Sequence, residues 1–390
     1  MEIRTTIQST IQPAFSLKKL KGIKPKGVKV KNDPIAPLLV ALAYSFADEF
    51  LSTHTFNTPF SLSPNNLSKI YVKLYEQNSP TLDDIDYTEE DLNKTIQLLS
   101  DSDMYDKLDE ESIELEEYCK SSPGVFALGI YSSILLDKLT EKNKEKGEST
   151  KIHVAGDGTR FDFLFSCAEN IDELIIENFK GNCIGSCIGG KKGNANTLQI
   201  SNCEGNNIGT AIGNVDSLII ANNSGNRIAT HLGTDSRNIN SVLIAHNFGF
   251  GLAYGLCGSY SSIARYFSGD TGVNFVMIAN NSIPFDEFRT DSKKPYVIGH
   301  QMMGVDTLMF YGNNAVLEES VASNNMCVNE LISDEEIAKY YFSSDLSFVK
   351  DVNHKHKIKQ ILDVKNLKKV NDLQETIILY EKSKEIMDIK

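Results

Sequence analysis

The sequence predicts an α+β protein in which a central right-handed parallel β-helix, or solenoid, is flanked by an N-terminal helical domain and C-terminal helices. Two observations predict the solenoid. A pattern recurs through residues 171–258: two apolar residues two positions apart, then an asparagine or histidine, a glycine, and apolar residues next to small ones. The pattern restarts at steps of 24, 20 and 24 residues, from Leu174 to Leu198, Leu218 and Val242. Repeats of this length are typical of solenoids, in which each coil buries its apolar face against neighbouring coils.

Each coil is predicted to be a short strand followed by a turn. Leu174 and Ile176 have the two-residue period of a strand with one face inward. Gly181 and Asn182 mark the turn, because glycine and asparagine accept positive φ at low cost. Equivalent residues of stacked coils lie roughly 4.8 Å apart, so we expect a structural ladder along one column. That column consists of Asn178, Asn202, Asn222 and His246. A leucine-rich horseshoe is the alternative fold, disfavoured because the glycine-rich turn is a poor helix former.

The glycine-rich turn also carries a family resemblance. The spacing Gly181-x-x-x-Gly185-x-x-Ile188-x-Gly190 resembles the β-helix repeats at the C-terminal end of glutamate synthase large subunits. It is similar, too, to the related subunit of formylmethanofuran dehydrogenase. The resemblance covers only the repeat region, and the chain departs from it in its uneven coil lengths and in asparagine at the turn. It implies a structural, interdomain β-helix and transfers no catalytic residue.

Length and composition predict two or three domains in a globular chain. Apolar residues make up 41% of 390 residues, enough to build a large core. The net charge of −13 conceals a strong segregation. Residues 1–31 carry eight basic side chains against one acid, whereas residues 83–117 carry fifteen acids against two lysines. An anionic partner is therefore not excluded by the total charge.

Four segments are predicted. Residues 1–31 form a basic extended arm, because Pro25 and the neighbouring glycines oppose a helix. Residues 32–148 form a helical domain, residues 149–325 the solenoid, and residues 330–390 a C-terminal helical segment. Its basic amphipathic helix at 351–370 precedes a final helix. The residues expected to bind RNA or another partner are Lys18, Lys19, Lys21, Lys24, Lys26, Lys29, Lys31, His354, Lys355, His356, Lys357 and Lys359. A solvated tail, or an arm folded over the acidic stretch, is the alternative for residues 1–31.

Local signals position elements within these segments. Pro34 and Pro64 are expected at helix starts, and Thr88 to Asp91 form a capping box. A further helix is expected after Pro123-Gly124, and the solenoid is expected to begin at Lys151. Two more coils are predicted at Val276 and Val305, whose sequences echo the earlier strands. One looser coil holds three aromatic residues that suit a cap over the open end of the stack: Phe161, Phe163 and Phe165.

Candidate chemical motifs are weak, so we expect no cofactor, no metal and no catalytic residue. Gly185 to Lys192 nearly matches a phosphate-binding loop, but lysine occupies the position of the magnesium-binding Ser or Thr. Cys183, Cys187 and Cys203 lack the paired spacing of a zinc site and are expected to fill space in the core. A polysaccharide-cleaving β-helix would need clustered carboxylates and aromatic platforms that the repeats do not present.

These observations favour a non-enzymatic assembly or adaptor protein, a scaffold whose basic terminal segments dock on RNA or a ribonucleoprotein such as the ribosome. Protein partners or a homo-oligomer are also compatible with it. Two alternatives stay open: a structural subunit of a multi-subunit oxidoreductase-type complex, and a standalone β-helix hydrolase or lyase. We expect a cytoplasmic protein, because the number of cysteines is odd and no signal peptide is visible. We expect no membrane partner, because the apolar runs are shorter than the ~20 residues that a membrane span requires.

Overall fold

The computed structural model describes the chain in segments, which are residues 35–53, 64–100, 113–116, 119–190, 193–233, 239–253, 273–282, 305–311, 313, 328–333, 349–351 and 372–386. The chain divides at Ile35 into two units, and the elements below belong to the second, Ala36–Lys390. The basic arm at 1–31 and the partner-binding residues predicted at 354–359 lie outside the described residues.

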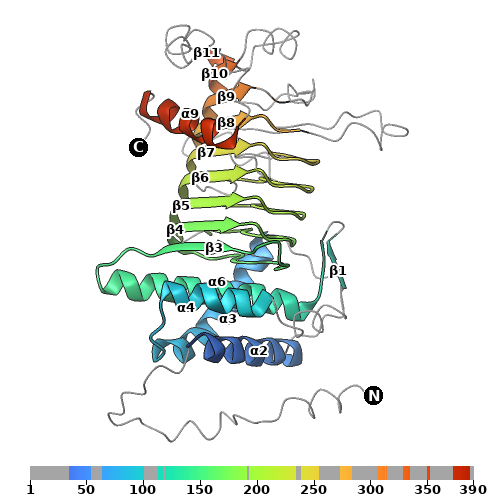
Figure 1. The fold of residues 1–390 in the computed structure, drawn as a ribbon, viewed down its shortest axis with the longest axis vertical. Helices are drawn as coiled ribbons and strands as arrows, with labels where there is room; N and C mark the ends of the chain where they lie inside the picture. Colours follow the sequence, from blue (N-terminus) through green and yellow to red (C-terminus); the bar gives the residue numbers. More distant parts are fainter. Residues whose placement is uncertain are drawn as a thin grey trace, which may run out of the picture. The chain divides into compact units, whose positions relative to one another are not determined.

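A nine-stranded parallel sheet forms the centre of this unit, with strands in chain order from β3 to β11 (Figure 1). The strands are β3 Lys151–Ala155, β4 Asn170–Glu177, β5 Asn194–Ser201, β6 Val215–Ala221, β7 Ile239–Ala245, β8 Val273–Ala279, β9 Val305–Tyr311, β10 Val328–Ser333 and β11 Val349–Asp351. Each coil thus contributes one strand, and sequence neighbours pair. The predicted parallel β-solenoid with flanking helices is confirmed.

The register of the sheet reproduces the register of the sequence repeat. Leu174 pairs with Leu198, Leu198 with Leu218, and Leu218 with Val242. The two additional coils predicted at Val276 and Val305 are present as β8 and β9. The same sheet continues past residue 325, where the sequence analysis ends the solenoid. Strands β10 and β11 extend it because Val328 pairs with both Val305 and Val349.

The interior is apolar, and glycine allows the coils to approach closely at the turn. Leu174, Ile176 and Ile184 are fully buried, as are their equivalents in the next coils. Gly205 has a φ of +153°, and a Cβ there would lie 1.8 Å from the carbonyl oxygen of Gly181 one coil earlier. No residue with a side chain fits at that position without moving the backbone.

Among the described residues, four helices and a small hairpin precede the solenoid. The helices are α2 Ile35–Thr53, α3 Pro64–Asp83, α4 Glu89–Ser100 and α6 Pro123–Glu145, and the antiparallel hairpin pairs β1 Ile113–Glu116 with β2 Cys119–Ser121. The predicted capping box opens α4, since the Thr88 amide donates to Asp91 Oδ2 at 2.9 Å and the Asp91 amide to Thr88 Oγ1 at 3.2 Å. Helix α6 begins at Pro123 itself, with Ser122 as its N-cap.

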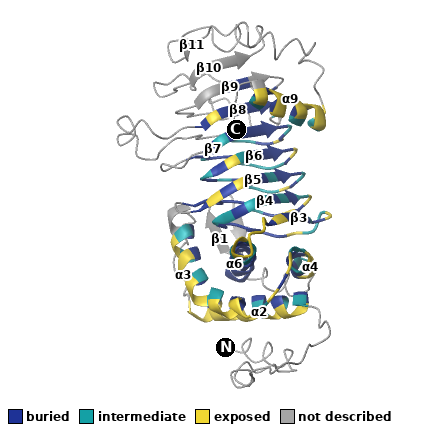
Figure 2. Cartoon of the chain, turned by 90° about the vertical axis from the view of Figure 1, so that its left-hand side faces the viewer, coloured by how far each residue is buried: buried dark blue, intermediate teal, exposed yellow. Residues whose placement is uncertain are grey.

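Helix α6 covers the first coil of the stack (Figure 2). Its small residues permit close packing, because a Cβ on Gly129 would lie 2.4 Å from the Cβ of Phe163. The Phe163 ring meets the Phe126 ring edge-on, with centroids 5.1 Å apart. The Ser133 hydroxyl donates to the carbonyl oxygen of Ser166 at 2.6 Å. The aromatic coil therefore forms the end of the core that α6 closes, as the sequence predicts.

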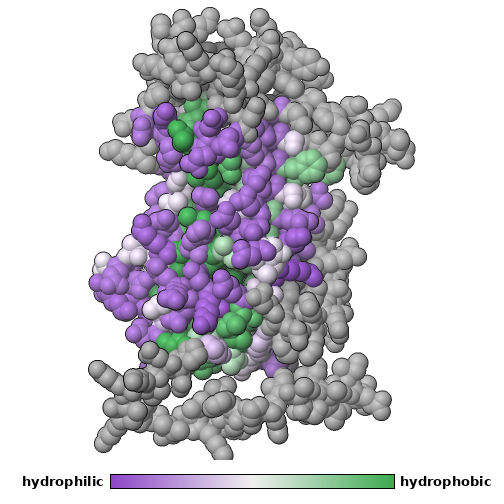
Figure 3. All heavy atoms as spheres, viewed as in Figure 1, coloured by the Kyte–Doolittle hydropathy of each residue, from purple (hydrophilic) through white to green (hydrophobic). Residues whose placement is uncertain are grey.

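The C-terminal helix α9, Leu373–Ile386, contacts β7 and β8 on the outside of the sheet (Figure 1). On the face that Figure 3 shows, the described side chains are mostly hydrophilic. The residues beneath α9 are an exception: they form a buried apolar cluster that includes Leu243 and Met277. The last helix thus shields a part of the sheet that would otherwise expose a large apolar area.

Candidate functional site

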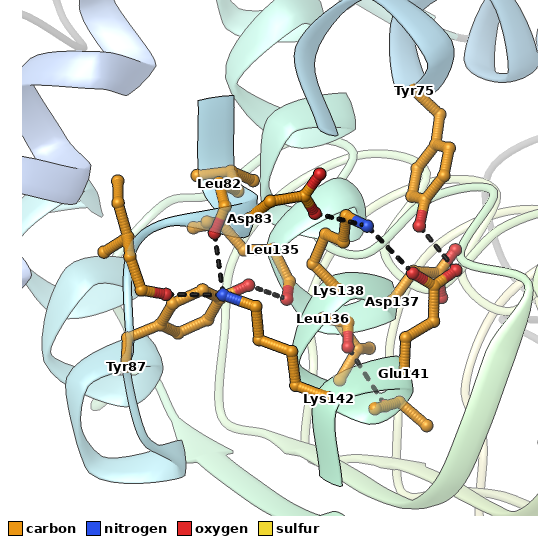
Figure 4. Close-up of polar contacts among 12 residues, drawn as sticks. Tyr75, Leu82, Asp83, Tyr87, Leu135, Leu136, Asp137, Lys138, Glu141 and Lys142 are labelled. Atoms are coloured by element: carbon orange, nitrogen blue, oxygen red, sulfur yellow. Dashed lines mark hydrogen bonds and ion pairs between the residues drawn. The ribbon is translucent and has the colours of Figure 1, made fainter. Parts of the chain in front are cut away.

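A cluster of phenols, carboxylates and ammonium groups joins α3, the loop that follows it, and α6 (Figure 4). We call it the α3–α6 polar cluster, which comprises Tyr71, Tyr75, Asp83, Tyr87, Asp137, Lys138, Glu141 and Lys142. The helical periodicity of α6 positions its members: Glu141 follows Asp137 by four residues and Lys138 by three, and Lys142 follows Lys138 by four, so they lie on one side of the helix. The sequence analysis did not single out any of these residues.

Asp137 is the buried centre of the cluster. Its carboxylate accepts hydrogen bonds from the Tyr71 hydroxyl, from the backbone N–H of Glu169 at 2.9 and 3.0 Å, and from the N–H of Asn170 at 2.9 Å. Burial raises the pKa of Asp137 to about 7, although the hydrogen bonds from Tyr71 and the two amides act in the opposite direction. One side chain thus connects α6 and α3 to the start of β4.

Lys138 and Glu141 link the helices nearer to the surface. The Lys138 ammonium lies 2.8 Å from Asp83 Oδ1 and 3.1 Å from Glu141 Oε2. Burial acts to lower the pKa of Lys138, but the bonds to Asp83 and Glu141 outweigh it and raise that pKa. The Tyr75 hydroxyl donates to Glu141 Oε1 at 2.5 Å, and burial together with this bond raises the pKa of Tyr75. These contacts fasten α3 to a polar stripe of α6.

Lys142 closes the C-terminal end of α3. Its ammonium donates to the carbonyl oxygens of Leu82 at 2.7 Å and Ile85 at 2.5 Å, and lies 5.3 Å from the centroid of the Tyr87 ring. A lysine at this place satisfies carbonyls that have no partner within the helix. The Tyr87 hydroxyl donates in turn to the carbonyl oxygen of Leu135 at 2.6 Å.

This arrangement is suited to structural cross-linking. Each charged member pairs with a neighbouring helix or with backbone. Asp137, whose carboxyl pKa is raised by burial, lies buried against the Tyr71 hydroxyl. Perturbed pKa values also occur in structural ion-pair networks, so this one does not by itself indicate catalysis. Among the residues that the structure describes, no three His, Cys, Asp or Glu side chains are grouped to hold a metal ion.

The column of Asn178, Asn202, Asn222 and His246 lies at the end of each strand on the outside of the solenoid. All four residues have φ between 54° and 59°, the left-handed region that asparagine tolerates better than most residues. The Asn222 amide donates to Asn202 Oδ1, and the Asn202 amide donates to Glu177 Oε1 at 2.8 Å. His246 instead approaches α9, with its Nε2 2.9 Å from the Thr376 hydroxyl.

A second asparagine column, one residue further along the later coils, is buried, and the sequence analysis missed it. It comprises Asn223, Asn247, Asn281 and Asn313. Asn247 shows the pattern: its Oδ1 accepts from the backbone N–H and the side-chain amide of Asn223 at 3.0 and 3.1 Å. Its Nδ2 donates to the carbonyl oxygen of Ile220 at 2.9 Å. The signal in the sequence was the doubled polar residue, as in Asn222-Asn223 and Asn280-Asn281.

The cysteines of the repeat occupy packed positions. The side chains of Cys167, Cys183, Cys187 and Cys203 are buried. Burial raises the pKa of the Cys203 thiol to about 11, so the thiolate is suppressed at neutral pH. Gly185 and Gly189, part of the motif that nearly matches a phosphate-binding loop, have φ of about 60° and face Ile200 and Asn214 of the adjoining coil. These glycines are required for packing between coils.

The fold and these sites define a parallel β-solenoid protein with a helical cap. Comparison with family models, with curated proteins and with solved structures finds no match. By length and composition α2 is apolar enough to cross a membrane, a test that core helices of soluble proteins also pass. One side of α2, including Leu39, Phe46 and Phe50, is buried in the helical cap.

Proposed function

We propose that this protein is a non-enzymatic assembly or adaptor protein, whose solenoid is a rigid support for basic terminal segments that dock on RNA or a ribonucleoprotein such as the ribosome. One observation carries the proposal. Within the described solenoid, the asparagine ladders satisfy one another and the backbone, and the interior is filled by apolar side chains. Such a body offers a stiff frame for the segments that the chain carries at its ends.

The charge distribution supports an anionic partner. Lysines concentrate in residues 18–31 and 355–369 of a chain whose total charge is −13. Each phosphate that a lysine neutralises releases counterions, so the affinity should fall steeply with salt. Two basic segments in one chain can contact a large anionic surface together, and this increases the apparent affinity.

Salt-titrated binding of the full chain to total RNA and to ribosomal particles tests the proposal. Replacing Lys18, Lys19, Lys21 and Lys24 by glutamine should reduce the slope of log K against log salt by about 3 units, since each contact to single-stranded RNA contributes about 0.7.

A matched control replaces four exposed lysines of the helical cap, Lys69, Lys73, Lys94 and Lys144. The control removes the same charge, so an equal effect would indicate unspecific attraction. If the full chain does not associate with RNA or ribosomal particles at low salt, the proposal of an anionic partner is wrong. Copurification with oxidoreductase subunits from native lysate would support the alternative, a structural subunit of an enzyme complex.

A further inference from the structure

Two buried cysteines occupy the same position in consecutive coils of the solenoid. The backbone N–H of Cys167 donates to the carbonyl oxygen of Ser186 at 2.8 Å, and the N–H of Gly189 donates to the carbonyl oxygen of Ala168 at 2.9 Å. In a parallel ladder, these two hydrogen bonds pair residue 167 with 187 and residue 168 with 188. Cys167 therefore lies directly beside Cys187 in the stack.

The backbone at these two positions is equivalent and closely spaced. Cys167 has a φ of 70° and Cys187 a φ of 60°, both in the left-handed region, and each side chain is 2% exposed. Paired residues of adjacent coils lie about 4.8 Å apart. This separation is within the range of roughly 4.4–6.8 Å that disulfides span between their Cα atoms.

The stack selects this pair among the four buried cysteines of the repeat. The neighbours of the other two in the adjoining coils are aromatic or amide side chains: Phe163 and Asn207 for Cys183, and Phe179 and Asn223 for Cys203. Cys183 and Cys203 thus face no cysteine in the column to which each belongs. A cross-link between adjacent coils is therefore expected at one place within this group.

The cysteine pair lies where the helical cap meets the solenoid. Ser166, which precedes Cys167, accepts a hydrogen bond at its carbonyl oxygen from the Ser133 hydroxyl of α6 at 2.6 Å. Cys187 belongs to the coil behind. A bond between the two sulfurs would fasten the coil that α6 contacts to the rest of the stack, and it would close a loop of about 20 residues.

We propose that Cys167 and Cys187 form a reversible disulfide when the protein meets a peroxide, and that this bond fastens the cap to the solenoid. One thiolate attacks a peroxide oxygen and breaks the O–O bond, which gives a sulfenic acid and one water. The second thiol attacks the sulfenic sulfur, and the S–S bond forms as another water leaves. The two thiols together lose two electrons and two protons, and the peroxide is reduced to two water molecules.

Burial and spacing both determine the character of this site. A small oxidant is required, because both side chains are almost inaccessible to solvent. Equivalent Cβ atoms of stacked coils are about 4.8 Å apart, slightly more than the roughly 3.5–4.5 Å of a relaxed disulfide. The bond is therefore strained, and strain makes a disulfide easier to reduce. This site does not depend on RNA binding by the lysine segments.

Peptide mapping of the full chain, treated with hydrogen peroxide and then alkylated, tests the proposal. Trypsin separates residues 161–180, which contain Cys167, from residues 181–191, which contain Cys183 and Cys187. The oxidised protein should yield these two peptides linked, and dithiothreitol should separate them. The link should persist in Cys183→Ala and disappear in Cys187→Ala.

Alanine is a suitable replacement, because Ala211 occupies the position equivalent to Cys187 in the next coil. Circular dichroism checks that each variant keeps its sheet, and Cys167→Ala provides a second variant that removes the same link. The linked protein should unfold at a temperature on the order of 5 °C higher than the reduced protein. The same treatment should leave the unfolding temperature of Cys187→Ala unchanged.

Absence of the linked peptides from peroxide-treated, folded protein would overturn the disulfide. A link between the same peptides that survives Cys187→Ala and disappears in Cys183→Ala would assign the bond to the wrong cysteine and overturn it equally. Equal unfolding temperatures for the linked and reduced proteins would overturn the fastening of the cap.

Discussion

The carboxylate of Asp137 in α6 accepts a hydrogen bond from the backbone amide of Asn170, the first residue of β4, at 2.9 Å. A helix of the cap and a strand of the solenoid thus share one buried carboxyl group. The same carboxylate accepts the Tyr71 hydroxyl from α3. Loss of this group should therefore loosen three elements together.

Replacement of Asp137 by alanine should lower the free energy of unfolding by about 3 kcal/mol, because two amides and a phenol would lose their acceptor in a buried place. Urea denaturation followed by circular dichroism measures the loss. Asp83→Asn is the matched control. It breaks the ion pair between Lys138 and the half-exposed Asp83 carboxylate, and should lower the free energy of unfolding by less than about 1 kcal/mol. Similar losses in the two variants would argue against a special role for Asp137.

The stability of the chain relative to its Asp137→Asn variant should fall as the pH rises through 7. The folded-state pKa of Asp137 is raised to about 7 from 3.8, so the folded protein binds this proton more tightly than the unfolded one. Its contribution is complete below pH 3.8 and is lost as the pH approaches and passes 7, at no more than about 1.4 kcal/mol per pH unit. Urea titrations between pH 5 and 8 measure the difference, and a constant difference would contradict the raised pKa.

Gly205→Ala should prevent normal folding or lower the free energy of unfolding by more than about 4 kcal/mol, since its Cβ would meet the carbonyl oxygen of Gly181 at 1.8 Å. Gly147→Ala is a suitable control. Gly147 also has positive φ, +75°, but nothing lies within 4 Å of its added Cβ, so only backbone strain of about 1–2 kcal/mol applies. Thermal unfolding and soluble yield compare the two, and an unaffected Gly205→Ala protein would disprove the tight stacking.

Asn247→Ala should destabilise the solenoid by about 3 kcal/mol, because it removes the acceptor of Asn223 and the donor to Ile220 from a buried column. Asn222→Ala, in the neighbouring column that lies toward solvent, should cost about 1 kcal/mol. Guanidinium denaturation of both variants gives the comparison. A larger loss at Asn222 than at Asn247 would reverse the roles that the structure gives to the two columns.

The repeat was predictable because its signals are local and recur. Alternation at Leu174 and Ile176, the glycine at the turn and the capping box of α4 each depend on residues a few positions apart. Strands β10 and β11 were not predicted, because their sequences lack the glycine-rich turn by which the earlier coils were recognised. Their place in the sheet follows from pairing with β9 alone.

The polar sites were less predictable than the fold. Asn222 and Asn223 are adjacent and chemically identical, yet one lies toward solvent and the other is buried, because the left-handed turn at Asn222 directs the next side chain inward. The α3–α6 polar cluster joins residues about 60 positions apart, and no sequence period relates Tyr71 to Asp137.

The sequence by itself determined the coil, its strand, its turn and the order in which coils stack, since these arise from interactions that each repeat makes again. Only the tertiary structure decided which polar groups share the buried space and which face α9 covers. Those outcomes depend on single contacts between residues far apart in the chain, such as the stacking of the Tyr380 ring on the Phe275 ring. A contact that occurs only once produces no periodic pattern in the sequence.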